Sequence, residues 1–505
     1  MLYFVIALAF LFLFFCILSI KYRLAESRIK RDDNLVFGTG LGVLVCLAVS
    51  TGVFLLLRED ALAYPFQKSL DYCNAYEQMF DAFMKRQLHI DVAPSDELVL
   101  MGNPYDSDLR KELDVSFLWD RAYFGGRYYS YFGIAPLLLI YFPYYFLTHT
   151  VPRPQTVCFI MSLFLIPAAA ALTVKMQRLF SEKLNPTLLL FSVMAVESAS
   201  LVFMLQSSAD NYYIPVESGV LFLSLFLLTT LCAYEKRENI NKSRLFFFLS
   251  GVCLVLIVMS RPNMAVYFLM AVPVYLHFLL SKDLKPSGKL LTVLCFAVPT
   301  AIGAAAVMYY NYIRFESVFE FGTSYQLTVH DVREYAYSAE LIMPMFYYYF
   351  FKQPAFSKNI PYLLIPFVGG LNVSGYIYLT STVGAFSFPS SWSLVFAPAA
   401  LYGQKNKVKA GIVLTGMACI LFTAYTDICF AGVNLRYLAD ISFITALLST
   451  VVIADIFELL SKKGGKAEYI SFVIICLAYV YSFLLGIMLI INNERDYIVK
   501  EYFGG

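Results

Sequence analysis

Long apolar runs, separated by short polar segments, recur along almost the whole chain and predict helices that cross a membrane. A hydrocarbon core of about 30 Å requires about 20 apolar residues in a helix, so the pattern predicts about 11 to 13 spans. The candidate spans are residues 1–20, 35–57, 134–147, 157–174, 188–205, 214–231, 245–259, 265–280, 290–308, 392–401, 412–429, 441–459 and 469–491. We therefore expect an all-α, polytopic integral membrane protein.

Two long stretches interrupt the apolar pattern and divide the chain into five parts. Residues 58–128 are rich in acidic side chains, and residues 309–391 are dense in tyrosine and phenylalanine, which suit the level of the lipid headgroups. The expected parts are N-terminal transmembrane helices (1–57), a first extracytoplasmic loop with interfacial helices (58–128), a central transmembrane bundle (129–308), a second aromatic-rich extracytoplasmic or interfacial region (309–391) and a C-terminal transmembrane bundle (392–505).

Lysine and arginine predict the orientation, because cytoplasmic loops are enriched in them. The basic cluster at 21–31 is expected inside, so the next span delivers the acidic loop to the outside. The later basic clusters, at 175–183, 236–244, 282–289, 405–409 and 462–466, should also be cytoplasmic. Two full spans at 134–147 and 157–174 would put Lys175 outside. One of these two segments is therefore expected to be re-entrant or interfacial, and the sequence leaves open which.

Composition narrows the function classes. With 59% hydrophobic and only 15% charged residues, the chain is not a soluble globular domain. The net charge of +2, without a basic tail, argues against nucleic acid as a partner. The ten cysteines form no CxxC pair and the four histidines are dispersed, so no zinc site is predicted.

The first loop carries candidate chemistry. Apolar and aromatic residues at 72, 76, 79, 80 and 83 have helical spacing, so this segment is expected to lie along the interface. Asp71 would stand at its start, as either an N-cap or an active carboxylate. Further on, residues 103–106 and 119–133 combine turn formers, aromatic rings, carboxylates and arginines. That mixture is typical of a site for sugar and phosphate, and equally of an aromatic belt with turns.

The order of these features resembles the GT-C superfamily of membrane glycosyltransferases. The resemblance depends on Asp71 and Tyr76, the Asp-Ala-Phe at 81–83, the Asn-Pro-Tyr-Asp at 103–106, the aromatic segment 128–136, the Ser-Arg-Pro-Asn at 260–263 and the Arg-Tyr at 436–437. It covers the first 150 residues best. The chain departs from the family in having Lys85-Arg86-Gln87 where a glycine is usual, and in lacking the adjacent Asp-Glu pair common at the first site.

The resemblance implies an enzyme that takes a sugar from a polyprenyl-phosphate-linked donor. The acceptor would be an extracytoplasmic glycan, lipid or protein of the cell envelope, and the enzyme would lie among the lipids of the plasma or inner membrane with its active site on the extracytoplasmic face. Asp71 is the implied general base, with Glu77 and Asp81 as alternatives. No cofactor is certain, and a divalent metal ion stays open.

The expected phosphate-binding residues are arginines, because negative charge develops on the leaving phosphate and requires cations. Arg261 and Arg436 stand at helix ends, where a charge at that depth is costly and usually functional. The expected phosphate-binding residues are Arg261, Arg436 and Arg127, and the expected substrate-binding residues are Tyr76, Asp106, Asp120, Tyr131 and Asp210.

Two other classes compete with the transferase. A flippase or transporter for a lipid-linked saccharide would also have about a dozen spans, but it would line a central path with charges and have little outer structure. The two long outer regions of this chain favour the transferase. A polysaccharide polymerase or ligase would share the compartment and the outer arginines, and differ in its reaction.

Overall fold

A computed structural model describes most of the chain. The described residues are 14–30, 36–57, 62–64, 74–181, 183–207, 209–282, 284–335, 338–357, 363–371, 373, 376–402 and 404–493. The proposed base Asp71 and most of the predicted span 1–20 lie outside them. The statements below concern the described residues.

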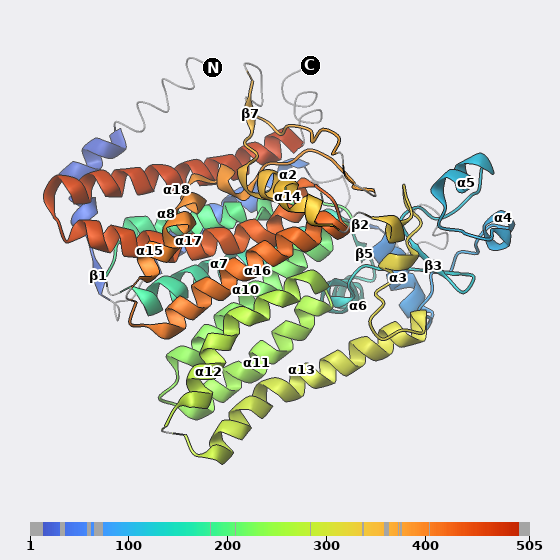
Figure 1. The fold of residues 1–505 in the computed structure, drawn as a ribbon, viewed down its shortest axis with the longest axis horizontal. Coiled ribbons are helices and arrows are strands. Elements are labelled where there is room, and N and C mark those ends of the chain that lie inside the picture. The colour runs from blue at the N-terminus through green and yellow to red at the C-terminus, as the bar shows by residue number, and fades with distance from the viewer. Residues whose placement is uncertain are drawn as a thin grey trace.

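Long apolar helices, packed side by side, make up most of the structure (Figure 1). They are α2 (Val36–Leu57), α7 (Pro154–Phe180), α10 (Ile214–Glu235), α11 (Ile240–Val258), η3 (Pro262–Ala271) with α12 (Val272–Leu280), α13 (Pro286–Phe315), α16 (Lys407–Phe430), η10 (Leu435–Leu438) with α17 (Ala439–Ser461) and α18 (Gly465–Asn493). Two shorter helices, α8 (Pro186–Ala199) and α9 (Val202–Ser207), pack among them. Nine of the described helical segments are long and apolar enough to cross a membrane. The all-α, polytopic fold class is confirmed.

The described spans are fewer than the 11 to 13 expected, because three of the apolar runs form shorter elements and most of a fourth, 1–20, lies outside the described residues. Residues 392–401 form the end of the 3₁₀ helix η9 (Pro389–Phe396) and the five-residue α15 (Ala397–Leu401). Residues 188–205 are divided between α8 and α9, since Leu201 between them has a left-handed φ of 59°. A run of apolar residues therefore does not always continue as one helix.

The topological conflict around Lys175 is resolved at α6. The apolar helix Leu137–Thr148, which comprises the π-helical turn η2 (Leu137–Tyr141) and α6 (Phe142–Thr148), rises only about 18 Å and is too short to span. Strand β2 (Ala63–Tyr64), which follows α2, pairs with β5 (Val151–Pro152), which follows α6. The chain therefore enters and leaves the 134–147 segment at the same end of the bundle, and between the first long loop and Lys175 the only described helix long and apolar enough to cross is α7.

Local sequence signals begin the helices. Asparagine side chains cap the N-termini of α8, α11 and α16, where Asn185, Asn239 and Asn406 each accept backbone N–H groups of the first turn. Proline stands in the first turn of α7, α10 and α13, where its missing N–H costs no hydrogen bond. These signals set where each span starts.

Small residues and buried hydroxyl groups hold the bundle together. A Cβ atom added at Gly251 of α11 would lie 2.6 Å from the Phe296 carbonyl oxygen of α13, so glycine permits the close contact of these helices. Ser50 of α2 lies 2.8 Å from the Ser162 hydroxyl of α7 and donates to Gln206 of α9. Such contacts replace the hydrophobic driving force that helices lack within lipid.

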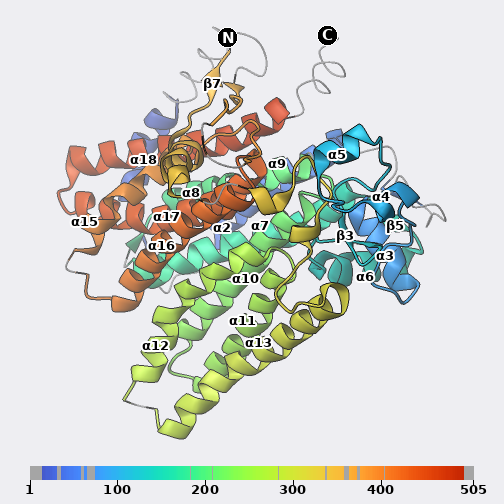
Figure 2. The same ribbon diagram turned by 45° about the vertical axis from the view of Figure 1, so that its right-hand side comes forward.

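A polar cap covers one end of the bundle and is built from both long outer regions. It contains α3 (Ala75–Met84), α4 (Asp96–Leu100), α5 (Ser107–Glu112), the hairpin β3 (Ala122–Phe124) and β4 (Arg127–Tyr129), η4 (Thr323–Tyr325) and η5 (Val332–Glu334). The two regions are joined by backbone hydrogen bonds: Asp120 N–H donates to Leu327 O, and Leu327 N–H donates to Arg121 O. Figure 2 shows α3, α4, α5 and β3 gathered there beside the end of α13.

The other described elements are short. They are η1 (Leu24–Glu26), β1 (Ile29–Lys30) paired with β6 (Lys183–Leu184), η6 (Ala339–Leu341), α14 (Ile342–Met345), η7 (Phe346–Phe351), β7 (Ala355–Phe356) paired with β8 (Leu363–Leu364), and η8 (Ala385–Ser387).

Candidate active site

A cleft opens between the polar cap and the ends of the helices. It consists of two cavities of about 340 and 400 Å³, which share part of their lining, including Tyr131, Tyr212, Arg261, Asn263, Arg436 and Tyr437. The smaller cavity, here called the apolar half, is also lined by Phe132, Ile134, Val258, Met259 and Val307. The larger, here called the polar half, is also lined by Trp119, Asp120, Gln326, Tyr335, Tyr378 and Asp427.

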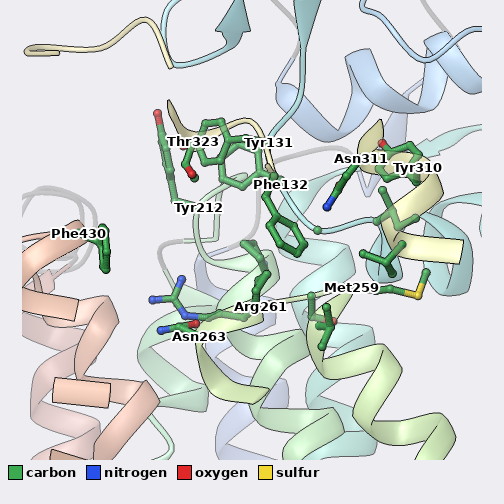
Figure 3. A pocket seen from close by; sticks show the side chains of 18 of the residues that line it. Tyr131, Phe132, Tyr212, Met259, Arg261, Asn263, Tyr310, Asn311, Thr323 and Phe430 are labelled. Carbon is green, nitrogen blue, oxygen red and sulfur yellow. The ribbon is translucent and has the colours of Figure 1, made fainter. Parts of the chain in front are cut away.

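Helix ends deliver the charged residues to the cleft. Arg261 follows α11 and precedes Pro262, which disfavours a helical conformation for the residue before it. Its φ of −147° and ψ of 89° accordingly break the helix at this point. Arg436 lies in η10, where the chain turns from α16 into α17. Figure 3 shows Arg261 and Asn263 pointing into a space bordered by Phe430, Tyr212 and Thr323.

Arg261 is held by a buried ion pair. Its Nε lies 2.7 Å from both carboxylate oxygens of Asp440, and its Nη2 lies 2.5 Å from Asp440 Oδ2. The Asp440 side chain is 0% exposed and that of Arg261 16%. Asn263 Nδ2 donates to Asp440 Oδ2 at 3.0 Å and to Asp427 Oδ1 at 2.8 Å. This network fixes the direction of the Arg261 guanidinium at the cleft.

Arg436 has a different environment. Its Nη2 donates to the Tyr437 hydroxyl at 3.0 Å, and its Cζ lies 4.8 Å from the centre of the Tyr212 ring and 4.9 Å from that of Tyr437. Arg261 Cζ lies 5.1 Å from the same Tyr437 ring. Among the described residues, no carboxylate forms an ion pair with Arg436. Among the described residues, the direct contacts of this guanidinium are thus two aromatic rings and one hydroxyl, while the Asp210 carboxylate acts on it electrostatically without an ion pair. Such an environment favours an anionic ligand.

Asp120 is buried in the polar half and accepts two side-chain hydrogen bonds. The Tyr131 hydroxyl donates to its Oδ2 at 3.0 Å, and Gln326 Nε2 donates to its Oδ1. Burial, followed by the negative charge of Asp120, raises the pKa of Tyr131, which keeps that hydroxyl protonated as the donor. Asp120 also has a left-handed φ of 58°, which is strained for a residue other than glycine. The network holds this turn in place.

The residues predicted on α3 lie behind the cleft and do not line it. Glu77 forms a capping box with Asn74, the N-cap of α3, which accepts the Tyr76 and Glu77 N–H groups. Asp81 forms an ion pair of 2.9 Å with Lys85. The Tyr76 hydroxyl donates to the Gly133 carbonyl at 3.0 Å, and so supports the segment that carries Tyr131.

Three further predicted residues are also absent from the cleft lining. Asp106 caps α5, accepting the Asp108 and Leu109 N–H groups. Arg127 is exposed on the hairpin β3–β4. Asp210 accepts the Tyr212 N–H at 2.6 Å, and so fixes the turn beneath a ring that lines the cleft. Of the predicted site residues that are described, the cleft brings together Arg261, Arg436, Asp120 and Tyr131.

Sequence reasoning missed Asp427, and it did not predict the ion pair between Arg261 and Asp440. Asp427 stands near the C-terminus of α16 and lines the polar half. A carboxylate inside an apolar run was the available signal, the same one that marks Asp440. Nothing local in the sequence predicts that both would meet Asn263. As for metal ligands, the described residues contain no group of three or more histidine, cysteine, aspartate or glutamate side chains that could hold an ion.

Comparison with known proteins finds a similarity of structure and no match of sequence. No protein-family model and no curated protein sequence matches the chain. Among solved structures, the chain is similar to the Archaeoglobus fulgidus oligosaccharyltransferase, crystallised tethered with an acceptor peptide containing the NVT sequon via a disulfide bond. The identity is 13%, the TM-score is 0.39, and the match covers 89% of this chain and 55% of that one. The chain thus spans about half the length of that protein.

Proposed function

We propose that the protein is a membrane glycosyltransferase, which transfers a sugar from a polyprenyl-phosphate-linked donor to an acceptor on the extracytoplasmic side. The observation that supports this most directly is Arg436, a guanidinium without a carboxylate partner among the described residues, at the boundary of an apolar and a polar cavity. A lipid phosphate that carries a sugar has the same three parts in the same order: an apolar chain, an anion and a polyhydroxylated ring.

The two arginines would act on the leaving group. When the bond between the anomeric carbon and the phosphate oxygen breaks, negative charge grows on the phosphate. Arg261 and Arg436 lie over one shared tyrosine ring, so a phosphate bound between them would receive donors from both. The apolar half would receive the first isoprene units, since Phe132, Val258 and Val307 line it.

The base remains the prediction made from the sequence. We propose Asp71 as the group that takes the acceptor proton, with Glu77 and Asp81 as alternatives. Since Glu77 is engaged in the capping box and Asp81 in an ion pair, their positions lend these two less support. Among the described carboxylates, Asp120 and Asp427 line the cleft, and Asp120 already accepts two hydrogen bonds.

The extracytoplasmic orientation is supported by the basic residues at the opposite end of the bundle. The cleft lies where α11, α13 and α16 end and where α17 begins. The basic clusters follow or precede the other ends of these helices: Lys236 and Arg237 before α11, Lys282 and Lys285 before α13, Lys405 and Lys407 at the start of α16, and Lys462 and Lys463 after α17. Because lysine and arginine mark the cytoplasmic side, the cleft would face outward.

The experiment compares two arginines in the purified protein reconstituted in liposomes. The substrate is a pool of radiolabelled polyprenyl-phosphate sugars, with an envelope fraction of the producing cells as acceptor. Arg436→Gln removes the unpaired guanidinium and should lower kcat/KM by about 10²-fold, the typical effect of one lost donor to a developing oxyanion. Arg127→Gln is the matched control, because Arg127 is exposed away from the cleft, and it should stay within about twofold.

Other outcomes would reject the proposal. If the wild type transfers no sugar and instead moves lipid-linked saccharide across the liposome membrane, the protein is a flippase. If it joins whole glycan chains in blocks rather than adding single sugars, it is a polymerase or ligase. If Arg127→Gln loses activity and Arg436→Gln does not, the phosphate lies elsewhere.

A further inference from the structure

The polar half has a lining that is suited to one class of acceptor. We propose that the acceptor is a carbohydrate, whose ring stacks on Trp119 and whose hydroxyl attacks the donor sugar. This inference rests on the proposed function and specifies its acceptor, which could otherwise be a glycan, a lipid or a protein.

Trp119 is an exposed aromatic surface at the edge of the polar half. Its side chain is 51% exposed, although it lines a cavity and stands next to the buried Asp120. The backbone around it is held firmly: Arg121 Nη1 donates to the Trp119 carbonyl at 3.1 Å, and the Asp120 N–H donates to Leu327 O at 2.9 Å. Asp120, the residue after Trp119, has a positive φ of 58°, and such strain is typical of functional sites.

The rest of the polar half offers flat rings and neutral hydrogen-bonding groups. Tyr335 and Tyr378 add two further aromatic residues to the lining, and Gln326 and Thr328 add an amide and a hydroxyl side chain. The Gln326 amide also donates to Asp120. A pyranose has faces of C–H groups, which pack on the electron-rich face of an aromatic ring, and an equator of hydroxyls, which need donors and acceptors. The lining offers both aromatic rings and hydrogen-bonding groups. Its two arginines, Arg261 and Arg436, are assigned to the donor phosphate and are not needed for the sugar ring.

A peptide or a lipid acceptor fits less well. Extended peptides commonly pair with a free strand edge. The strand nearest the polar half, β3, pairs with β4 on one side and forms a bridge from Ala122 to Gln326 on the other. Both of its edges are therefore occupied. A lipid acceptor would need its own apolar path, whereas the residues that line only the polar half are largely tyrosine, threonine, glutamine and aspartate.

The reaction is a group transfer in which one bond replaces another. The oxygen of the acceptor sugar's hydroxyl forms a bond to the anomeric carbon of the donor. The bond from that carbon to the phosphate oxygen breaks, and its electron pair remains on the departing polyprenyl phosphate. The acceptor proton passes to the carboxylate base, and no oxidant or reductant takes part.

The acceptor class is tested by the linkage of the product. The wild-type protein in liposomes is incubated with radiolabelled polyprenyl-phosphate sugars and the envelope fraction, and the labelled product undergoes methylation linkage analysis. The label is expected in a glycosidic bond to another sugar. A label attached to an amino-acid side chain or to a lipid headgroup would overturn the inference and leave the transferase intact. No transfer into any fraction would reject the proposed function and the inference with it.

The role of Trp119 is tested by the kinetics of three variants. The acceptor is the oligosaccharide fraction released from the same envelope, measured as total hexose. Trp119→Ala should raise the KM for this acceptor about tenfold, consistent with a lost stacking contact, while the KM for the donor stays unchanged. Trp119→Phe should restore most of the acceptor affinity, because a ring face returns.

The second tryptophan supplies the control. Trp392 donates its Nε1–H to the Phe386 carbonyl at 2.8 Å and packs against the Phe386 ring, and it does not line the cleft. Trp392→Phe should leave both KM values unchanged. Equal rises in the donor and acceptor KM of Trp119→Ala would indicate a structural role and overturn the stacking assignment, as would an acceptor KM unaffected by that substitution.

Discussion

The two halves of the cleft share Arg261 and Arg436 and differ in the residues that line only one of them. The apolar half lies among the ends of the spans, where Val258, Met259 and Val307 line it. The polar half lies under the cap, where Asp120 and Gln326 are joined by a hydrogen bond. Arg261 and Arg436 stand at the junction. A guanidinium is costly to bury in lipid, and in water its attraction for an anion is weakened by the high dielectric constant. It therefore binds an anion most effectively at the boundary between the two.

The two arginines differ in how their burial is compensated. Arg261 is paired with the fully buried Asp440, whereas Arg436 is stacked on Tyr212 and Tyr437. Pairing orients a side chain but neutralises much of its charge. Stacking keeps the charge available. Arg261 therefore combines a structural role with its proposed function. Of the two, Arg436 has more of its charge available to a ligand.

Removal of the proposed base should have the largest effect. Asp71→Asn should lower kcat by about 10³-fold, because a general base contributes roughly 10²- to 10⁴-fold. Transfer by the purified variant is measured after its elution profile shows a folded protein. Asp120→Asn and Asp427→Asn are assayed beside it. If either of these two variants loses more activity than Asp71→Asn, the base is the corresponding aspartate that lines the polar half.

The difference between the arginines should appear in stability. Arg261→Gln leaves Asp440 buried without its ion-pair partner, and it should lower the free energy of unfolding by about 3 to 5 kcal/mol. Arg436→Gln leaves no described carboxylate without an ion-pair partner and removes two cation–π contacts, so it should cost less, about 1 to 2 kcal/mol. Thermal unfolding of the two detergent-solubilised variants measures both losses of stability. Equal losses would show that Arg436 is as structural as Arg261.

The apolar half should matter in proportion to the length of the lipid chain. Val307 on α13 is buried and lines this half, and Val307→Ser should raise the KM for a long-chain polyprenyl donor about tenfold, since apolar contact is lost. The KM for a donor with only two isoprene units should change less. Ile302→Ser is the control on the same helix, because Ile302 is 67% exposed and does not line the cleft. Equal effects on both donors would place the chain elsewhere.

The smallest effect is expected in the cap, as a function of pH. The Arg333 guanidinium, hydrogen-bonded to Asp331, holds the pKa of that carboxyl below its usual range. The stabilisation is present above the unfolded-state pKa of about 3.9 and is lost as the pH falls through the lower folded-state pKa. The wild type and Asp331→Asn should therefore differ in Tm at pH 6, and the difference should shrink as the pH falls below about 4. A constant difference across this range would exclude the ion pair as its cause.

Local patterns predicted the elements better than their endings. Hydropathy located the spans of α7, α10 and α13, because each span must satisfy its backbone hydrogen bonds within itself. The N-cap of α3 was misplaced, although the spacing from Asn74 to Glu77 fits a capping box. That signal was readable, and it explains why Glu77 is engaged in a cap. The shortness of the 134–147 run was also readable, since it has fewer than the about 20 residues that a span needs, but the sequence left open whether this run or 157–174 fails to span.

Charge alone singled out Arg261 and Arg436, since each is costly at its depth and must therefore be compensated. By itself the sequence determined the membrane class, most of the spans and this short set of residues. Only the tertiary structure decided that Arg261 meets Asp440, 179 positions away, and that both arginines lie over Tyr437. Insertion into lipid depends on the composition of each segment, whereas the partner of a buried charge depends on which helices pack together, and that is settled by contacts between residues far apart in the chain.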